Sequence, residues 1–190
     1  QVVTTTQYQI FTKYYEQYFD QLYRYVLFRS GHNKDLAFDL TSELFLKALE
    51  KFDSYDPTRS DFKNWIYGIA RNHLIDYYRT RRELVDIDDV DHLLVSPDKL
   101  VENLNISYDT ATVVYALSKI PESQQEIIQL KFFSEMTNQE LAQLFHKTEG
   151  NIRVMLHRAI TTLKQEIART FSPIHAQAIT RTHFQGIIAH

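Results

Sequence analysis

The sequence has no cysteine, and its four glycines and four prolines make only eight residues of these two types. Without cysteine it has no disulfide framework and no cysteine-based zinc module, which is compatible with a reducing cytosol. So few glycines and prolines leave little material for the turns of an all-β fold, which favours a mostly helical protein. No apolar run approaches the roughly 18 residues of a membrane span, and residues 1–6 lack a signal-peptide pattern, so we expect a cytoplasmic protein.

The net charge of −3 is unevenly distributed along the chain. Residues 63–82 carry five basic side chains against one acidic, and residues 137–190 carry six basic against three acidic. Residues 83–109, between these segments, carry eight acidic side chains and one basic, a net charge of −7. Two basic segments on either side of an acidic connector are compatible with nucleic-acid binding despite the negative total.

Apolar residues recur every three or four positions, the period of amphipathic helices. In the N-terminal half this pattern predicts helices over about 10–27, 36–52 and 62–80, with a polar loop from Asp53 to Ser60. In the C-terminal half it predicts helices over about 111–119, 122–133, 138–145 and 149–170. The predicted fold class is all-α: two small helical domains joined by an acidic flexible linker, the second a helix-turn-helix domain.

The helix-turn-helix prediction rests on two capped helices joined by a short turn. Thr137 and Glu140 form a capping box, and Thr148 can cap the next helix. The second helix of such a pair enters the DNA major groove, where arginine suits guanine or phosphate and asparagine suits adenine. Its first turns expose Asn151, Arg153, Val154, His157 and Arg158. A helical hairpin with solvated arginines has the same pattern, so both interpretations stay open on this feature.

The stretch from Trp65 to Arg82 mixes aromatic and basic side chains. Stacking combined with phosphate neutralisation is how proteins hold single-stranded nucleic acid. The alternative is that Trp65 and Tyr77 belong to the core and that the arginines end a solvated helix. For Trp65 taken alone, the core is the favoured interpretation.

Two groups of motifs together resemble the extracytoplasmic-function (ECF) sigma factors of the sigma-70 superfamily. The group that resembles sigma region 2 comprises residues 39–49 (DLTSELFLKAL), 62–72 (FKNWIYGIARN) and 76–79 (DYYR). The group that resembles region 4 comprises residues 116–122 (ALSKIPE), 140–142 (ELA), 149–153 (EGNIR) and 158–159 (RA). The order of the two groups, with an acidic segment between them, makes the resemblance more specific than either group alone.

The resemblance implies a bacterial transcription initiation factor without catalytic activity or cofactor, which binds core RNA polymerase and promoter DNA. Residues 8–82 would form the region 2-like domain, 83–109 the linker, and 110–170 the region 4-like domain; residues 171–190 form an extension of unknown role. The linker would thread the basic channel of the polymerase, although a plain solvated tether fits its composition equally well. An anti-sigma factor is a possible further partner, and no membrane insertion is expected.

The resemblance also implies three sets of binding residues. One face of the second predicted helix would bind the polymerase, through Asp39, Leu40, Glu43, Phe45 and Leu46. The alternative interpretation of this face is an ordinary acidic surface exposed to solvent. Capture of the open minus-10 element falls to Tyr55, Arg59, Phe62, Asn64, Trp65, Arg71, Asn72 and Arg79. Recognition of the minus-35 duplex falls to Thr137, Thr148, Asn151, Arg153, Val154, His157 and Arg158.

The sequence departs from the family pattern in the turn of the helix-turn-helix. His146 stands where such factors often have glycine, and histidine can still occupy a left-handed backbone conformation there, but less easily than glycine. Val154 and Met155 occupy recognition-helix positions that are often polar or basic. A metal site is not expected, because His175, His183 and His190 have poor spacing for one and lack accompanying carboxylates.

The main rival function is a two-domain helix-turn-helix regulator that binds duplex DNA without a sigma role. An enzyme is a weaker alternative, because the sequence has no phosphate-binding glycine loop, no cysteine nucleophile, and no His and carboxylate pair at ligand spacing.

Overall fold

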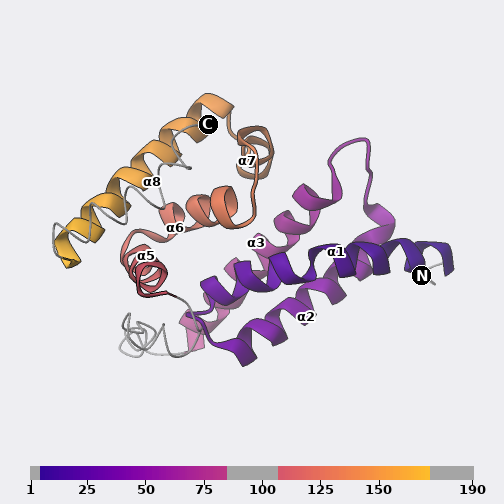
Figure 1. The fold of residues 1–190 in the computed structure, drawn as a ribbon. Helices are drawn as coiled ribbons and strands as arrows, with labels where there is room; N and C mark the ends of the chain where they lie inside the picture. The colour runs from indigo at the N-terminus through magenta and orange to yellow at the C-terminus, as the bar shows by residue number, and fades with distance from the viewer. Residues whose placement is uncertain (1–4, 85–106, 172–190) are drawn as a thin grey trace. The chain divides into compact units, whose positions relative to one another are not determined.

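The computed structural model describes residues 5–84 and 107–171, which form helices and loops without a β-strand (Figure 1). The chain divides into two compact units, one built mainly on the N-terminal helices and the other mainly on the C-terminal ones. The first holds α1 (Thr5–Arg29), α2 (Lys34–Lys51), the short 3₁₀ turn η1 (Phe52–Ser54) and α3 (Phe62–Leu84). The second holds α5 (Tyr108–Lys119), α6 (Glu122–Ile128), the π-helical turn η3 (Gln129–Phe133), most of α7 (Asn138–Phe145) and α8 (Glu149–Thr170), whereas Gln143–His146 group with the first unit.

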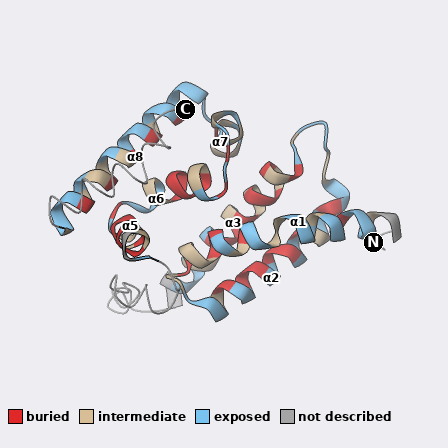
Figure 2. Ribbon diagram, viewed as in Figure 1, coloured by how far each residue is buried: buried red, intermediate tan, exposed pale blue. Residues whose placement is uncertain are grey.

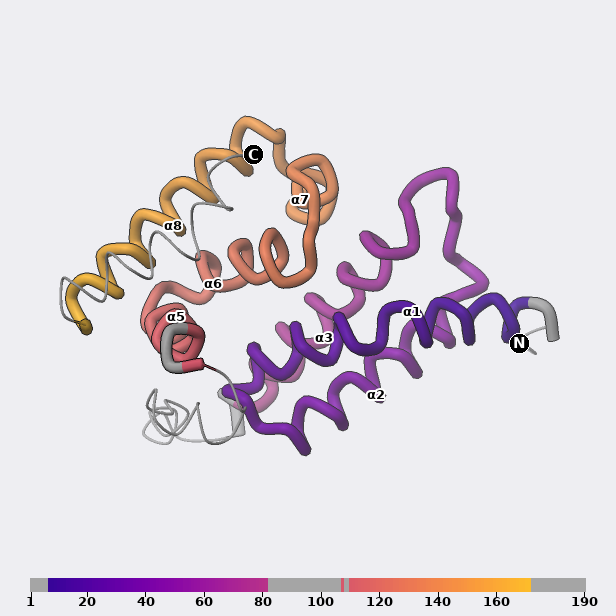
Figure 3. Tube along the Cα trace, in the orientation of Figure 1, coloured from indigo at the N-terminus to yellow at the C-terminus, as the bar shows by residue number. Residues whose placement is uncertain are grey.

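The helices of the first unit begin at side chains that cap free backbone N–H groups. The side chain of Asn33 accepts a hydrogen bond from the Leu36 amide at 3.0 Å and starts α2. Asp61 accepts from the Asn64 amide at 2.7 Å and starts α3. Gly31 and His32 both have positive φ, which reverses the chain between α1 and α2. The two helices therefore lie side by side as a hairpin (Figures 1 and 3).

The core of the first unit is formed by the inner faces of its three helices (Figure 2). Its largest fully buried side chains are Leu22 of α1, Leu40 and Leu44 of α2, and Ile66, Tyr67 and Leu74 of α3. A cluster of aromatic rings extends this core toward the loop between α2 and α3. Burial of these side chains at spacings of three and four is what fixes which face of each helix is left for partners.

The second unit packs α5 and α6 against the long helix α8. Its largest fully buried side chains are Leu117, Ile127, Leu130, Met136, Leu141 and Ile152. After α6 the chain widens into a π-helical turn, with the Ser134 amide donating to the Gln129 carbonyl at 3.1 Å. The predicted continuous helix over 122–133 is therefore two different helical forms in succession.

The all-α prediction is confirmed, and the helices lie close to the predicted ranges. The predicted linker, residues 83–109, overlaps a helix at each end, because α3 continues to Leu84 and α5 begins at Tyr108. The remainder of the linker, residues 85–106, and the extension from residue 172 onward lie outside the described residues.

Candidate functional site

The loop between α2 and α3 (Figure 3) is held in shape largely by the carboxylate of Asp56. This side chain accepts hydrogen bonds from the amide and the hydroxyl of Thr58, at 2.9 and 2.6 Å. These bonds lower the pKa of Asp56, since they favour its charged form. Asp56 also pairs with Arg59 at 3.4 Å, and the guanidinium is 86% exposed. The loop therefore presents an arginine to solvent on a backbone that is already ordered.

An aromatic cluster supports this loop from inside the unit. The ring of Phe62 stacks on Tyr14, with centroids 3.9 Å apart and planes 3° from parallel. Trp65 lies 5.4 Å from Phe62 and 5.1 Å from Tyr55, and is half-buried. Tyr55 at the start of the loop is half-buried as well. Part of each of these last two rings is accessible, so they can act as stacking surfaces at the edge of the core.

Tyr55 keeps its hydroxyl proton over the whole physiological pH range. Burial is the largest cause that raises its pKa, to about 12, and the neighbouring Tyr14 and Asp61 act in the same direction. A neutral tyrosine offers a ring face for stacking together with a polar O–H group. This combination suits an unpaired base better than a phosphate.

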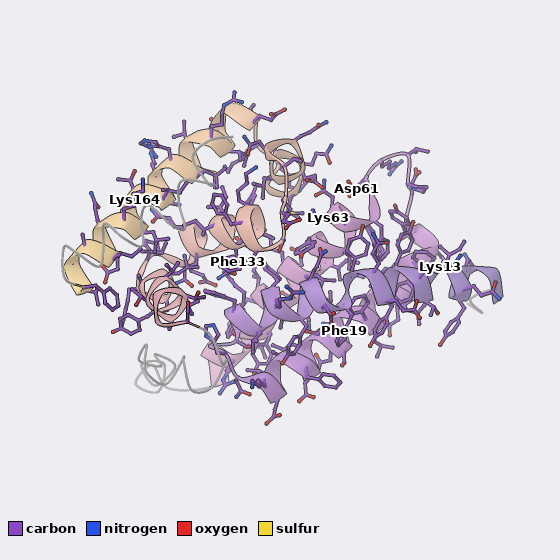
Figure 4. All side chains as sticks on the ribbon, viewed as in Figure 1. Lys13, Phe19, Asp61, Lys63, Phe133 and Lys164 are labelled. Carbon is purple, nitrogen blue, oxygen red and sulfur yellow. The ribbon has the colours of Figure 1, made fainter. Side chains whose placement is uncertain are left out.

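The accessible side of α3 continues from this loop along the helix, and the side chains of Asp61 and Lys63 mark where it begins (Figure 4). Arg71 is half-buried, whereas Asn72 and Arg79 are exposed. Arg79 forms an ion pair with Asp76 at 3.1 Å, in which both side chains are more than half exposed. Such an exposed pair is worth little, so Arg79 can exchange Asp76 for a phosphate at small cost.

Four predicted site residues are buried, which corrects the sequence-based interpretation. Phe62 is only 3% exposed and is surrounded by six aromatic rings, so it supports the loop and has no accessible ring face. Asn64, in the first turn of α3, is buried as well. Leu40 and Phe45 of α2 are also core residues, because they fall on the inner stripe of that helix. For Leu40, Phe45 and Phe62 the physical reason is the same: a motif identifies a segment, while helical phase decides which of its residues reach the surface.

The outer face of α2 combines acidic and apolar side chains. Asp39 and Glu43 are exposed, and Leu46 is 60% exposed. Phe38 is 56% exposed on the same helix, and the sequence analysis did not include it among the docking residues. Its position outside the apolar stripe of the helix could have indicated that it is exposed. Exposed large apolar side chains with acidic neighbours are typical of a surface that binds a protein partner.

One buried histidine lies beneath this face. His73 of α3 is 6% exposed, and its Nδ1 lies 2.7 Å from Lys47 Nζ of α2. Its Nε2 lies 3.4 Å from Glu43 Oε2. Burial, followed by the charge of Lys47, lowers the pKa of His73 against the weaker opposing effects of Glu43, the Leu40 backbone and Asp76. Sequence reasoning missed this histidine, because nothing in the motif distinguishes it from a core position.

In the second unit, α7 and α8 form the predicted pair of capped helices. Thr137 and Glu140 make the capping box, with the Glu140 amide donating to Thr137 Oγ1 at 3.1 Å and the carboxylate accepting from the Thr137 amide. The Asn151 amide donates to Thr148 Oγ1 at 3.3 Å. His146 has φ of 52°, the left-handed conformation expected for it. The His146 and Lys147 amides close the turn onto carbonyls of α7, the hydrogen-bond pattern of a Schellman C-cap.

The outer face of α8 carries the side chains predicted for duplex recognition. Asn151, Val154 and Arg158 share one side of the helix by their spacing, and Arg153 and His157 lie beside them. All of these, together with Thr137 and Thr148, are exposed. The opposite side of α8 is buried through Ile152, Leu156, Ala159, Leu163 and Ile167. The exposed side of α8 therefore carries polar side chains, two arginines and the apolar Val154.

Within residues 5–84 and 107–171, no group of three or more His, Asp or Glu side chains is arranged to hold a metal ion. No helix in the same ranges has the length and hydropathy needed to cross a membrane.

Two family models match the chain, and each covers one of the two helical units. Residues 14–83 match sigma-70 region 2, and residues 111–163 match sigma-70 region 4. The two matches occur in the order that the motifs predicted. The segment between them contains most of the acidic connector.

Similar proteins and similar folds agree with these models. The ECF RNA polymerase sigma factor BldN of Streptomyces coelicolor is 34% identical over 162 residues, which cover 80% of this chain and 58% of that protein. The ECF RNA polymerase sigma factor SigM of Bacillus subtilis is 30% identical over 156 residues, which cover 79% of this chain and 90% of that protein.

Among solved structures, the fold is similar to that of the sigma factor RpoE in complex with the anti-sigma factor NepR from Bartonella quintana. That match has a TM-score of 0.66 at 23% identity and covers 86% of this chain and 99% of the other. CnrH in complex with the cytosolic domain of CnrY gives a TM-score of 0.64 at 20% identity. The resemblance seen in the sequence is confirmed by the family models and by the relatives. The chain therefore belongs to the sigma-70 family, in its ECF group of RNA polymerase sigma factors.

Proposed function

We propose that the chain binds core RNA polymerase, directs it to specific promoters and helps to melt the minus-10 element. The observation that carries this proposal is the conjunction of two surfaces in one chain. One is a loop and helix suited to an unpaired strand, and the other is a helix-turn-helix suited to a duplex. A promoter that is being opened presents both forms of DNA at once, one at each element. A duplex-binding regulator needs only the second surface.

Docking on the polymerase uses the outer face of α2. The residues that can contact a partner are Asp39, Glu43 and Leu46, joined by Phe38 in place of the buried Leu40 and Phe45. Two exposed apolar side chains supply area to be buried, and the two carboxylates favour a partner with basic groups at the rim. Sigma factors are not enzymes in general, and the proposed role needs no catalytic residue.

Melting uses the loop and the accessible side of α3. Arg59 and Arg79 neutralise phosphates, while Tyr55 and Trp65 stack on unpaired bases and Asn72 bonds to the same strand. Binding of the open strand, together with capture of an unstacked base, offsets the few kcal/mol that unpairing costs. Melting then needs no ATP, because the open form is stabilised by the contacts it alone can make.

Recognition of the upstream element uses α8. Arg153 and Arg158 are positioned for guanine edges or phosphates, and Asn151 for adenine. Val154 offers an apolar contact to a thymine methyl group. The hydroxyls of Thr137 and Thr148 accept the capping bonds and still have a proton to donate to a phosphate.

We also propose that the chain acts in the cytoplasm, where RNA polymerase works, and that an anti-sigma factor sequesters it. The exposed acidic and apolar face of α2 supports sequestration, since a protein partner would cover it in the resting state. Affinity purification from cells under inducing and resting conditions tests this. Recovery of polymerase subunits alone under both conditions would contradict it.

Transcription in vitro with core polymerase, with and without the chain, on a library of genomic fragments tests the main proposal. We expect new start sites that share upstream and near-start motifs. The rival, a helix-turn-helix regulator, predicts binding to duplex fragments without polymerase and no new transcripts. Arg59→Ala should weaken binding of the holoenzyme to a promoter with an unpaired minus-10 element. Lys13→Ala is the control and should not weaken it, because Lys13 is an exposed basic residue on α1 (Figure 4).

A further inference from the structure

His73 connects the proposed docking face to the interior of the first unit. It lies on α3, one residue beyond Asn72, and its ring reaches across to α2. There it meets two residues of one helical turn, Glu43 and Lys47, which are four positions apart and so share a face. Each ring nitrogen is close to one of them: Nδ1 to Lys47 and Nε2 to Glu43.

The protonation state of the ring follows from the chemistry of its neighbours. A lysine ammonium group has donors only, so the 2.7 Å contact requires His73 Nδ1 to accept a hydrogen bond. The ring is then neutral, with its single proton on Nε2, which faces the Glu43 carboxylate at 3.4 Å. Nε2 makes no hydrogen bond of good geometry among the described residues, to Glu43 or to the nearby Leu40 carbonyl, although that carbonyl also favours the protonated ring and raises its pKa. The neutral ring thus binds Lys47 firmly and Glu43 weakly.

This arrangement keeps the two charges of α2 apart. Glu43 and Lys47 at this spacing would otherwise pair with one another. The bond to His73 holds the Lys47 ammonium, while the Glu43 side chain remains 60% exposed. The Glu43 carboxylate can therefore form a hydrogen bond with a basic group of a partner without first breaking a strong hydrogen bond inside the protein.

We propose that His73 is a positioning residue of the docking face: in its neutral form it holds Lys47 and leaves Glu43 available to the polymerase, and protonation reverses both effects. The protonated ring has no acceptor for Lys47 and repels it, and Nε2 becomes a charged donor beside Glu43. Glu43 is then bound internally, and docking weakens. The charges that act on the ring come from Lys47 and Glu43 of α2 and from Asp76 of α3 itself. This inference rests on the proposed function, because it assigns α2 to docking.

The test measures the affinity of the full chain for core RNA polymerase at pH 7.5 and pH 5.5. His73→Asn keeps a side-chain acceptor near the position of Nδ1 and cannot titrate, and His73→Leu removes the acceptor while filling the space. His32→Asn is the matched control, since Asn tolerates the positive φ of His32 and the substitution removes another histidine of the same unit. Each affinity is expressed relative to that of His73→Asn at the same pH, which cancels any titration of the polymerase.

We expect wild type and His73→Asn to bind alike at pH 7.5. As the pH falls from 7.5 to 5.5, wild type should lose affinity relative to His73→Asn, and the loss should approach about tenfold as the ring becomes fully protonated, the weight of one hydrogen bond to a charged group. His73→Leu should be weak at both pH values, and His32→Asn should follow wild type. Circular dichroism at each pH confirms that every variant is folded.

Two outcomes overturn the inference alone: a pH profile of His73→Asn that coincides with wild type, or full affinity of His73→Leu. Each would leave wild-type binding at pH 7.5 intact, so the proposed function would stand. Absence of wild-type binding at pH 7.5 would overturn the proposed function and the inference with it.

Discussion

Replacing Phe62 by leucine separates a core role from a DNA-binding role. The ring is 3% exposed, stacks on Tyr14, and lies within 5.6 Å of Tyr18, Tyr55 and Trp65. Leucine restores much of the apolar volume but loses the aromatic geometry, in which each pair contributes about 0.5–1.5 kcal/mol. The substitution removes the equivalent of two or three aromatic pairs and leaves part of the volume of the ring empty. We therefore expect the free energy of unfolding to fall by about 2 kcal/mol.

The assay is thermal unfolding followed by fluorescence. Trp65 is the only tryptophan in the chain and its ring lies 5.4 Å from Phe62, so its emission reports on this unit alone. For a domain of this size, 2 kcal/mol corresponds to a decrease in Tm of roughly 10 °C. Tyr8→Leu is the control, because that ring is 59% exposed and its loss should leave Tm nearly unchanged.

The opposite result would refute the reasoning. If Phe62→Leu left Tm unchanged but abolished binding to a promoter with an unpaired minus-10 element, the ring would be a DNA contact and the packing argument would be wrong. If Tm falls as expected, promoter binding measured well below the transition should be largely retained, because Tyr55 and Arg59 are still present.

Three further predictions concern the second unit and the effect of pH. Thr148→Ala removes the cap of α8 and should lower the free energy of unfolding by about 1 kcal/mol, measured by denaturant titration with circular dichroism; Thr161→Ala, on an exposed position within α8, should have a smaller effect. Arg153→Ala should weaken holoenzyme binding by about 1–3 kcal/mol at promoters with the preferred upstream element, measured by competition between promoters that differ only there; equal affinities before and after the change would contradict its assignment. Stability of the first unit, followed by Trp65 fluorescence in denaturant, should be highest above about pH 6.5 and fall as pH falls below it. Burial lowers the pKa values of His32 and His73 from 6.5 in the folded state, so the unfolded chain takes up protons first. Stability that stays constant from pH 7.5 to 5.5 would show that neither histidine is buried in solution.

The sequence determined the class of the protein and the position of its helices. Spacing of apolar residues fixes helical segments because burial of one face is what stabilises them, and that spacing is visible in one dimension. Caps at Asp61, Thr137 and Thr148 mark helix starts for the same reason, since the bond spans only three residues. The exposed set on α8 was also predictable, because its polar and apolar positions alternate with a clear helical period.

Only the tertiary structure decided which members of each motif reach the surface. Leu40, Phe45 and Phe62 stand in motifs that were predicted to bind partners, yet their side chains are buried in the core. Phe38 is exposed because it lies on the outer side of its helix. The contact between His73 and Lys47 joins two helices and residues that are 26 positions apart. Helix phase and packing between helices set these outcomes, and both depend on contacts between residues distant in sequence. The sequence by itself therefore specified what kind of surfaces this protein has, and the packing of the helices specified which atoms form them.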